Sequence, residues 1–125
     1  EWLEQAFRRV AFNVRAANCD DHTKNFAFML KQGGRWELAP AYDICHAYRP
    51  ESSWVSQHAL SINGRRRDIT RDDILTVAKS INIKKPADII DEVRNAVSHW
   101  KKWADSASVG TALRKQIEST FVSLK

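Results

Sequence analysis

Hydrophobic residues recur at helical spacing from the first residues of the chain. The positions that share one helical face are Leu3, Phe7, Val10, Ala11 and Val14. This spacing predicts a helix that runs to about Ala17. The segment that follows, "NCDD", ends the helix because Asn and Asp favour turns over helix interiors.

A β-hairpin is predicted for the next apolar segment. The stretch "NFAFMLK" places Phe26, Phe28 and Leu30 on one side, and "RWELA" alternates apolar with charged residues. Gly33 and Gly34 lie between the two stretches and provide the turn. Pro40 then ends the second strand, since proline cannot continue a central ladder.

The remaining chain is irregular at first and then helical. The segment 49–67 lacks periodicity, apart from a short strand expected at Ala59–Ile62 and a turn at Asn63–Gly64. Thr70 and Asp73 have the spacing of a helix N-cap and its capping box, and this helix is expected to reach about Ser80.

Two further helices are predicted towards the C-terminus. Pro86 suits the first turn of a helix. The apolar stripe of that helix comprises Ile89, Ile90, Val93, Ala96, Val97 and Trp100, and the stripe of the last helix comprises Val109, Leu113, Ile117, Phe121 and Leu124. We interpret both stripes as core. The predicted fold class is α+β, mostly helical, with one hairpin, in a single unit spanning residues 1–125.

Composition supports a folded domain with a hydrophobic core. Of the 125 residues, 43% are hydrophobic, including five Trp and five Phe, and 28% are charged. The net charge of +5 would attract phosphate groups, but the basic residues are scattered over several sites, as on a solvated surface.

The cysteine content, the apolar runs and the start of the chain bear on where the protein is located and whether the sequence is complete. Only two cysteines are present, which favours a reducing compartment and a cytoplasmic location. No apolar run approaches the roughly 18 residues of a membrane span, and no signal peptide is visible. The chain does not begin with Met, and "EWLEQAFRRVAFNV" reads as the middle of a helix, so we expect a piece of a longer protein.

The polar loop "NCDDHTKN" carries the candidate chemistry. Four residues separate Asp20 from Asn25, and Asp43 lies at the exit of the predicted hairpin. Because a hairpin returns the chain to near its start, Asn25 and Asp43 are expected to lie close together. Both side chains offer hard oxygen ligands, which suit Mg²⁺.

Each of these residues also has a structural interpretation. Asp20 can bond locally at the end of the first helix, and Asp43 can bond to a nearby turn. Lys24 either meets a transferring phosphate or is an exposed lysine. His22 either contacts a nucleotide or is a hydrogen-bonded structural histidine. The joint arrangement across the hairpin favours a functional site.

The gap between Asp20 and Asn25 equals that of the protein-kinase catalytic loop, H-R-D-x-x-x-x-N. The stretches "FNVRAANCDDHTKNFAFML" and "WELAPAYDI" resemble the C-terminal lobe of HipA-like serine/threonine kinases, the toxins of bacterial toxin–antitoxin pairs. The downstream stretch "QHALSINGRRRDITRDDI" is also similar to that family. The matching positions are Phe12, Asn13, Asn18, Asp20, His22, Lys24, Asn25, Leu38, Pro40, Tyr42 and Asp43.

The resemblance implies the C-terminal lobe of a protein-kinase-like fold and a role for each site residue. Asp20 would be the catalytic base that accepts a proton from a protein hydroxyl, and Asn25 and Asp43 would be the Mg²⁺ ligands. The side chains that would contact or adjoin ATP are His22, Thr23, Lys24, Tyr42, Asn25 and Asp43. Implied partners are an N-terminal kinase lobe, a DNA-binding antitoxin of HipB type and protein substrates that include the translation machinery. Any DNA contact would be indirect, through the antitoxin.

Part of a kinase is not visible in the sequence. A kinase needs a loop that covers the nucleotide and a lysine from an N-terminal lobe. The four glycines of this chain form no Gly-rich loop. We therefore expect these residues alone to bind ATP poorly and to transfer no phosphate.

Three other interpretations remain open at this point. A zinc site would use Cys19, His22, Cys45 and His46, although adjacent Cys45 and His46 are poorly spaced ligands. A metal-dependent nuclease would use Asp20, Asp21, His22 and Lys24. A non-catalytic interaction module would dock a partner, and an exposed apolar patch on the hairpin side would support it.

Overall fold

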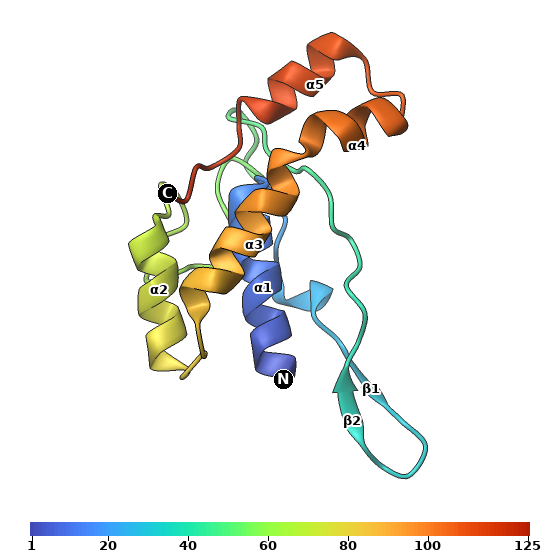
Figure 1. Ribbon diagram of the computed structural model, residues 1–125, viewed down its shortest axis with the longest axis vertical. Helices are drawn as coiled ribbons and strands as arrows, with labels where there is room; N and C mark the ends of the chain where they lie inside the picture. The colour runs from blue at the N-terminus through green and yellow to red at the C-terminus, as the bar shows by residue number, and fades with distance from the viewer.

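Five α-helices and one two-stranded antiparallel sheet make up the computed structural model, which describes residues 1–125 (Figure 1). This confirms the predicted class, mostly helical with one hairpin. The elements in chain order are α1 (Trp2–Arg15), a 3₁₀ turn η1 (Thr23–Asn25), β1 (Phe28–Leu30), β2 (Trp36–Leu38), α2 (Arg71–Ser80), α3 (Pro86–Ser98), α4 (Trp100–Ser106) and α5 (Thr111–Glu118). None of the helices has the length and apolar character required to cross a membrane.

The first helix ends two residues earlier than the sequence pattern suggested. Ala17 has a left-handed φ of 54°, which takes the chain out of the helix. The backbone N–H of Asn18 then donates to the carbonyl of Asn13 at 2.9 Å. This bond satisfies one of the carbonyls left open at the helix end.

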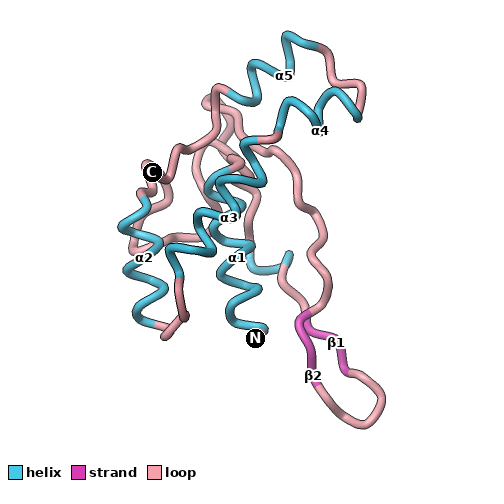
Figure 2. Tube along the Cα trace, in the orientation of Figure 1, coloured by secondary structure: helices cyan, strands magenta, loops and turns pink.

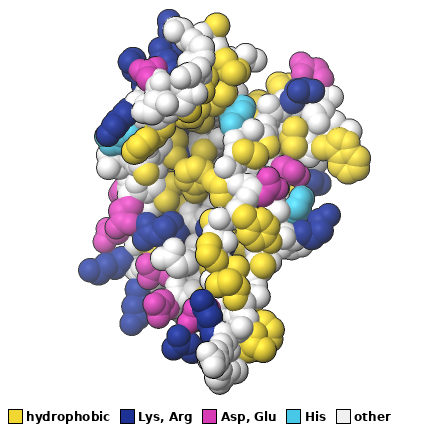
Figure 3. Space-filling model, turned by 90° about the vertical axis from the view of Figure 1, so that its right-hand side faces the viewer, with side chains coloured by type: hydrophobic (Ala, Val, Ile, Leu, Met, Phe, Trp, Pro, Cys, Tyr) yellow, Lys and Arg dark blue, Asp and Glu magenta, His cyan; other side chains and the backbone are white.

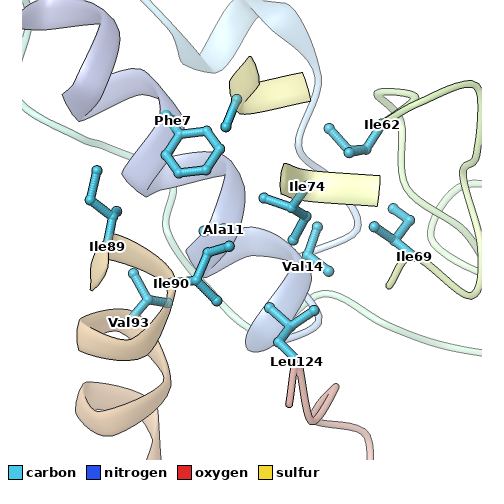
Figure 4. Packing of buried hydrophobic residues seen from close by; sticks show 11 residues of the cluster. Phe7, Ala11, Val14, Ile62, Ile69, Ile74, Ile89, Ile90, Val93 and Leu124 are labelled. Atoms are coloured by element: carbon cyan, nitrogen blue, oxygen red, sulfur yellow. The ribbon is translucent and has the colours of Figure 1, made fainter. Parts of the chain in front are cut away.

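The hydrophobic core lies between α1, α2 and α3. Phe7, Ala11 and Val14 project from α1 and meet Ile89, Ile90 and Val93 of α3 and Ile74 of α2 (Figure 4). Leu124, from the tail after α5, completes the cluster. Most of the apolar stripe predicted for the first helix and the first part of the stripe predicted for the helix at Pro86 therefore form the core as expected. Ala96, by contrast, is exposed, and Trp100 is half-buried and begins the next helix, α4.

Local sequence signals set the start of two helices. The Thr70 side chain accepts from the backbone N–H of Asp73, and the Asp73 carboxylate accepts from the backbone N–H of Thr70. This is the predicted capping box, and α2 ends at the predicted Ser80. Pro86 is the first residue of α3, where its missing N–H costs no helical hydrogen bond.

The hairpin projects away from the helices (Figures 1 and 2). Its register pairs Phe28 with Leu38 and Leu30 with Trp36. Directly paired side chains share one face, so these four form an apolar face. Gly33 and Gly34 in the turn have φ values of 90° and 81°, which side chains other than glycine rarely adopt.

The structure corrects two predictions about elements. The expected strand at Ala59–Ile62 is absent, and only an isolated bridge joins Ile62 to Arg65 around the predicted turn at Asn63–Gly64. The single long last helix predicted to carry Val109 to Leu124 is also replaced by the short helix α5 and a tail, and the separate short helix α4 precedes it. Ser108, with a left-handed φ of 58°, follows the end of α4.

The stripe predicted for the last helix is only partly helical. Val109 precedes α5, and Phe121 and Leu124 follow it. The hydroxyls of Ser119 and Thr120 donate to carbonyls three residues earlier, in competition with the helical hydrogen bonds. Leu124 is buried as expected, but Leu113 is exposed, so the interpretation of this stripe as core holds only in part.

Candidate functional site

The polar loop after α1 is joined to the chain that leaves the hairpin. The N–H of Cys19 donates to the carbonyl of Ala47 at 2.9 Å, and the N–H of Ala47 donates to the carbonyl of Ala17 at 3.1 Å. These bonds form an isolated parallel bridge between Asn18 and Ala47. As a result, residues on both sides of the hairpin lie next to each other.

The expected proximity of Asn25 and Asp43 is confirmed. The Asn25 side-chain amide donates to a carboxylate oxygen of Asp43 at 3.0 Å and to the carbonyl of Asp20 at 3.2 Å. The η1 turn places Asn25, and the hairpin brings Asp43 back to it. Asp43 has a φ of 53°, a left-handed conformation that Asp tolerates better than most residues.

Asp20, His22 and Asp43 form the cluster with metal-ligand character. One potential ligand atom from each lies within 4.8 Å of the others. His22 Nε2 is 3.8 Å from Asp20 Oδ1. On the face towards the hairpin, Figure 3 shows acidic side chains beside a histidine, with hydrophobic side chains around them.

The donor chemistry of this cluster fits Mg²⁺. Asp20 and Asp43 provide carboxylate oxygens, the ligand type that Mg²⁺ prefers, and a partly exposed site leaves room for water and phosphate. In this structure the side-chain NH₂ group of Asn25 faces Asp43. Coordination by Asn25 therefore requires its amide to rotate so that Oδ1 replaces Nδ2.

The other predicted site residues surround this cluster. The Tyr42 hydroxyl donates to the carbonyl of Lys24 at 2.6 Å, which links the two sides of the hairpin again. The side chains of Thr23 and Lys24 are exposed. His22 Nδ1 is buried and has no hydrogen-bond partner in the protein. Nucleotide contact by these four residues remains a prediction.

The sequence interpretation missed the role of Asp21. Its carboxylate is 3% exposed and accepts from His58 Nδ1 at 2.9 Å, from the N–H of Ala59 at 2.8 Å and from the N–H of Leu60 at 3.3 Å. Asp21 therefore faces the interior, whereas Asp20 faces the cluster. The only sequence signal was the apolar setting of His58 in "QHALSI".

His58 is held in its charged form by this contact. Burial lowers the pKa of His58, but the hydrogen bonds with Asp21 and Cys19 and their charges outweigh burial and raise the pKa to about 9. His58 therefore carries a positive charge at neutral pH. A buried charge of this kind is stable only with a bonded partner.

A second missed pair consists of Asn13 and Asn18. Asn18 is fully buried and donates from its amide to the side-chain oxygen of Asn13 at 3.0 Å and, more weakly, to the carbonyl of Asp43 at 3.5 Å. These bonds connect α1 to the backbone of Asp43. Both residues lie in "FNVRAAN", which the sequence analysis used only as part of a family pattern.

The geometry weakens two of the alternatives. The residues of the proposed zinc site do not converge, since the only cluster of three or more potential ligands contains neither cysteine. Partial burial, with Asp43 and Asp20 nearby, also raises the pKa of the Cys45 thiol, whereas zinc binds the thiolate. The nuclease interpretation loses Asp21, whose oxygens are occupied in the interior.

The third alternative, a docking module, gains support. The hairpin and the start of α1 expose four large apolar side chains: Trp2, Phe28, Leu30 and Trp36. Trp2 and Phe28 contact each other edge to face with ring centroids 5.6 Å apart. An exposed apolar patch of this kind is typical of interaction surfaces.

Comparison with known proteins gives one match. The family model described as the HipA-like C-terminal domain matches residues 1–100. No curated protein and no solved structure matches the chain.

Proposed function

Because this chain belongs to the family of HipA-like C-terminal domains, part of the HipA kinase family, we propose that it provides the catalytic loop and the metal-binding residues of a serine/threonine protein kinase. The observation that supports this proposal most is the Asn25–Asp43 contact at 3.0 Å, across a hairpin that separates the two residues in sequence. Protein-kinase chemistry needs this arrangement of an Asp, an Asn five positions further and a second Asp.

Asp20 is the proposed catalytic base. Its carboxylate is half exposed, so a hydroxyl on a protein substrate can approach it. It would accept the hydroxyl proton while the oxygen attacks the γ-phosphoryl group. The neighbouring residues Cys19 and Asp21 are buried, which leaves Asp20 as the exposed acid of "NCDD".

Asn25 and Asp43 are the proposed Mg²⁺ ligands, with Asp20 and His22 beside them. Mg²⁺ and ATP, when bound, supply the phosphoryl group and neutralise the charge that develops on it. Thr23 and Lys24 are exposed next to the metal residues, and the Tyr42 hydroxyl holds the carbonyl of Lys24. We propose that these residues contact the nucleotide phosphates.

The apolar face of the hairpin is the proposed docking surface for a lobe that covers the nucleotide. Its exposed members are Phe28, Leu30 and Trp36, with Trp2 adjacent. A kinase needs a Gly-rich loop and a strand lysine, and these 125 residues contain no Gly-rich loop. The family further suggests a cytoplasmic protein with protein substrates and a DNA-binding antitoxin of HipB type, which would make any DNA contact.

Divalent-cation binding by the 125-residue protein tests the site. Mn²⁺ is a suitable probe because it binds oxygen ligands as Mg²⁺ does and is followed by electron paramagnetic resonance. Asp43→Ala and Asn25→Ala should each weaken Mn²⁺ binding by about tenfold or more, since loss of an outer-shell partner alone typically costs that much. Asp72→Ala is the matched control, since Asp72 is an exposed acid on α2, and it should bind Mn²⁺ as the unaltered protein does.

Equal Mn²⁺ affinity in the unaltered protein and in Asp43→Ala would refute the metal assignment. Phosphate transfer is tested separately with radiolabelled ATP and a general protein substrate. We expect no transfer by the 125-residue protein alone, and Mg²⁺-dependent transfer by these residues would overturn the need for a second lobe. Cleavage of plasmid DNA with Mg²⁺ would instead favour the nuclease.

A further inference from the structure

Both neighbours of Asp20 are bonded to one short downstream segment, residues 58–60. The carbonyl of Cys19 accepts from the N–H of Ala59 at 3.0 Å. The carboxylate of Asp21 accepts from His58 Nδ1 and from the backbone of Ala59 and Leu60. Asp20, between these two attachments, is half exposed and yet fixed at its backbone on each side.

The segment that holds Asp21 is itself well fixed. His58 is 6% exposed. Its N–H donates to the carbonyl of Arg66 at 2.9 Å, and its carbonyl accepts from Arg66 Nε at 2.6 Å. Ile62, two residues after Leu60, belongs to the hydrophobic core. The bonds to Asp21 therefore connect the polar loop to the packed part of the molecule.

All the hydrogen bonds that the Asp21 carboxylate forms in the protein are with residues 58–60. One oxygen accepts from two backbone N–H groups, and the other accepts from the imidazole of His58. No group of the cation cluster forms a hydrogen bond with it. The hydrogen bonds of Asp21 therefore act on that cluster through the position of the loop.

We propose that Asp21 and His58 are positioning residues, which set the placement of Asp20 and Asn25 relative to Asp43. The inference rests on the proposed function, in which these three residues form the catalytic and metal site. Loss of the His58 donor leaves a buried carboxylate short of one bond, so the loop shifts to bring Asp21 towards water. The shift separates Asn25 from Asp43 and weakens the site.

His58→Ala and His58→Asn are the variants that test the proposal. Both variants remove the positive charge of His58, but Asn places an amide N–H near the position of His Nδ1, so comparing the two separates loss of the hydrogen bond from loss of the charge. Mn²⁺ affinity is measured by electron paramagnetic resonance, and the Asn25 side-chain amide is followed by NMR. We expect His58→Ala to weaken Mn²⁺ binding about tenfold, the size of outer-shell effects at metal sites. It should also move the Asn25 amide resonance, whereas His58→Asn should restore both values.

Val93→Ala is the control for general loss of stability, since Val93 lies in the core on α3 and takes no part in the hydrogen bonds that hold the loop. It should leave the Mn²⁺ affinity and the Asn25 resonance unchanged. The proposal is overturned if His58→Ala binds Mn²⁺ like the unaltered protein, or if Val93→Ala weakens binding equally. If His58→Ala does not fold, Arg66→Ala replaces it, and unchanged values in that variant overturn the proposal.

The two proposals fail differently. Absence of Mn²⁺ binding by the unaltered protein refutes the metal site. The positioning role is then decided by the Asn25 amide resonance alone. A shift in His58→Ala but not in Val93→Ala supports positioning, and no shift refutes it.

Discussion

The three-helix core and the hairpin-and-loop region are held together by different forces. In the core, Ile74 and Ile90 are fully buried among aliphatic side chains of α1, α2 and α3. In the hairpin, Leu30 is 57% exposed and Trp36 is 64% exposed. The polar loop between these regions is fixed chiefly by hydrogen bonds of buried polar residues, such as Asp21 and Asn18.

This difference separates stability from the candidate chemistry. Apolar burial tolerates small shifts because it is not directional, whereas hydrogen bonds fix distances and angles. The region that needs defined geometry is therefore the one built from polar contacts. The hairpin contributes little apolar burial within this chain, so its apolar face is free for a partner.

The largest expected effect on stability comes from the core. Ile90→Ala should lower the free energy of unfolding by about 2–5 kcal/mol, because it removes buried methyl groups and leaves a cavity. Urea unfolding followed by circular dichroism measures this change. Ile90→Val, with a smaller deletion at the same position, should cost only about 1 kcal/mol. If Ile90→Ala lowers the free energy of unfolding by less than about 1 kcal/mol, Ile90 does not lie at the centre of the core.

The next effect concerns the loop and depends on pH. The pKa of His58 is raised from 6.5 to about 9 in the folded protein, so its stabilising contribution is fully present below pH 6.5 and is lost as the pH rises through 9. The loss should be on the order of 2 kcal/mol. Urea unfolding at pH 6 and pH 9.5 measures it.

His58→Asn is the control for this pH dependence. It keeps a hydrogen-bond donor but does not titrate, so the difference in stability between the two pH values should shrink. An equally large difference in His58→Asn would assign the pH dependence to other groups.

A smaller effect is expected at the start of α2. Thr70→Ala removes the side chain that accepts from the N–H of Asp73 and should cost about 1 kcal/mol of stability. Thr70→Ser keeps the hydroxyl and should lie close to the unaltered protein in the same urea unfolding experiment. Equal losses in the two variants would mean that the methyl group, and not the cap, stabilises the helix.

The smallest effect is expected in the hairpin. Trp36→Ala should change the free energy of unfolding by less than about 0.5 kcal/mol, since the side chain is mostly exposed. Thermal unfolding followed by circular dichroism provides the measurement, with exposed Leu113 on α5 as the comparison position. A loss comparable to that of Ile90→Ala would contradict the division into two regions.

Local patterns in the sequence predicted the elements that depend on near neighbours. The stripe of α1, the turn at Gly33 and Gly34 and the capping box of Thr70 each follow from residues a few positions apart. The contact between Asn25 and Asp43 was also predictable, because the two strands of a hairpin run antiparallel and bring its two ends close together.

Other features depend on contacts that no local pattern contains. Asp20 and Asp21 are neighbours of the same residue type. Only the direction of the backbone decides that the Asp20 side chain faces solvent and the Asp21 side chain faces His58. The same holds for the tail after α5, where hydroxyl groups end the helix and Leu124 packs against residues more than a hundred positions earlier. Periodicity predicted its burial but not its conformation.

The position of Leu124 has a practical consequence. The family match stops at residue 100, yet Leu124 fills part of the core, and Val122 exchanges hydrogen bonds with Arg15 at the end of α1. A protein truncated after residue 100 would lose these contacts and expose the aliphatic core residues that Leu124 covers. A protein made for expression or crystallisation should therefore extend beyond residue 100, where the family match ends, and include Leu124.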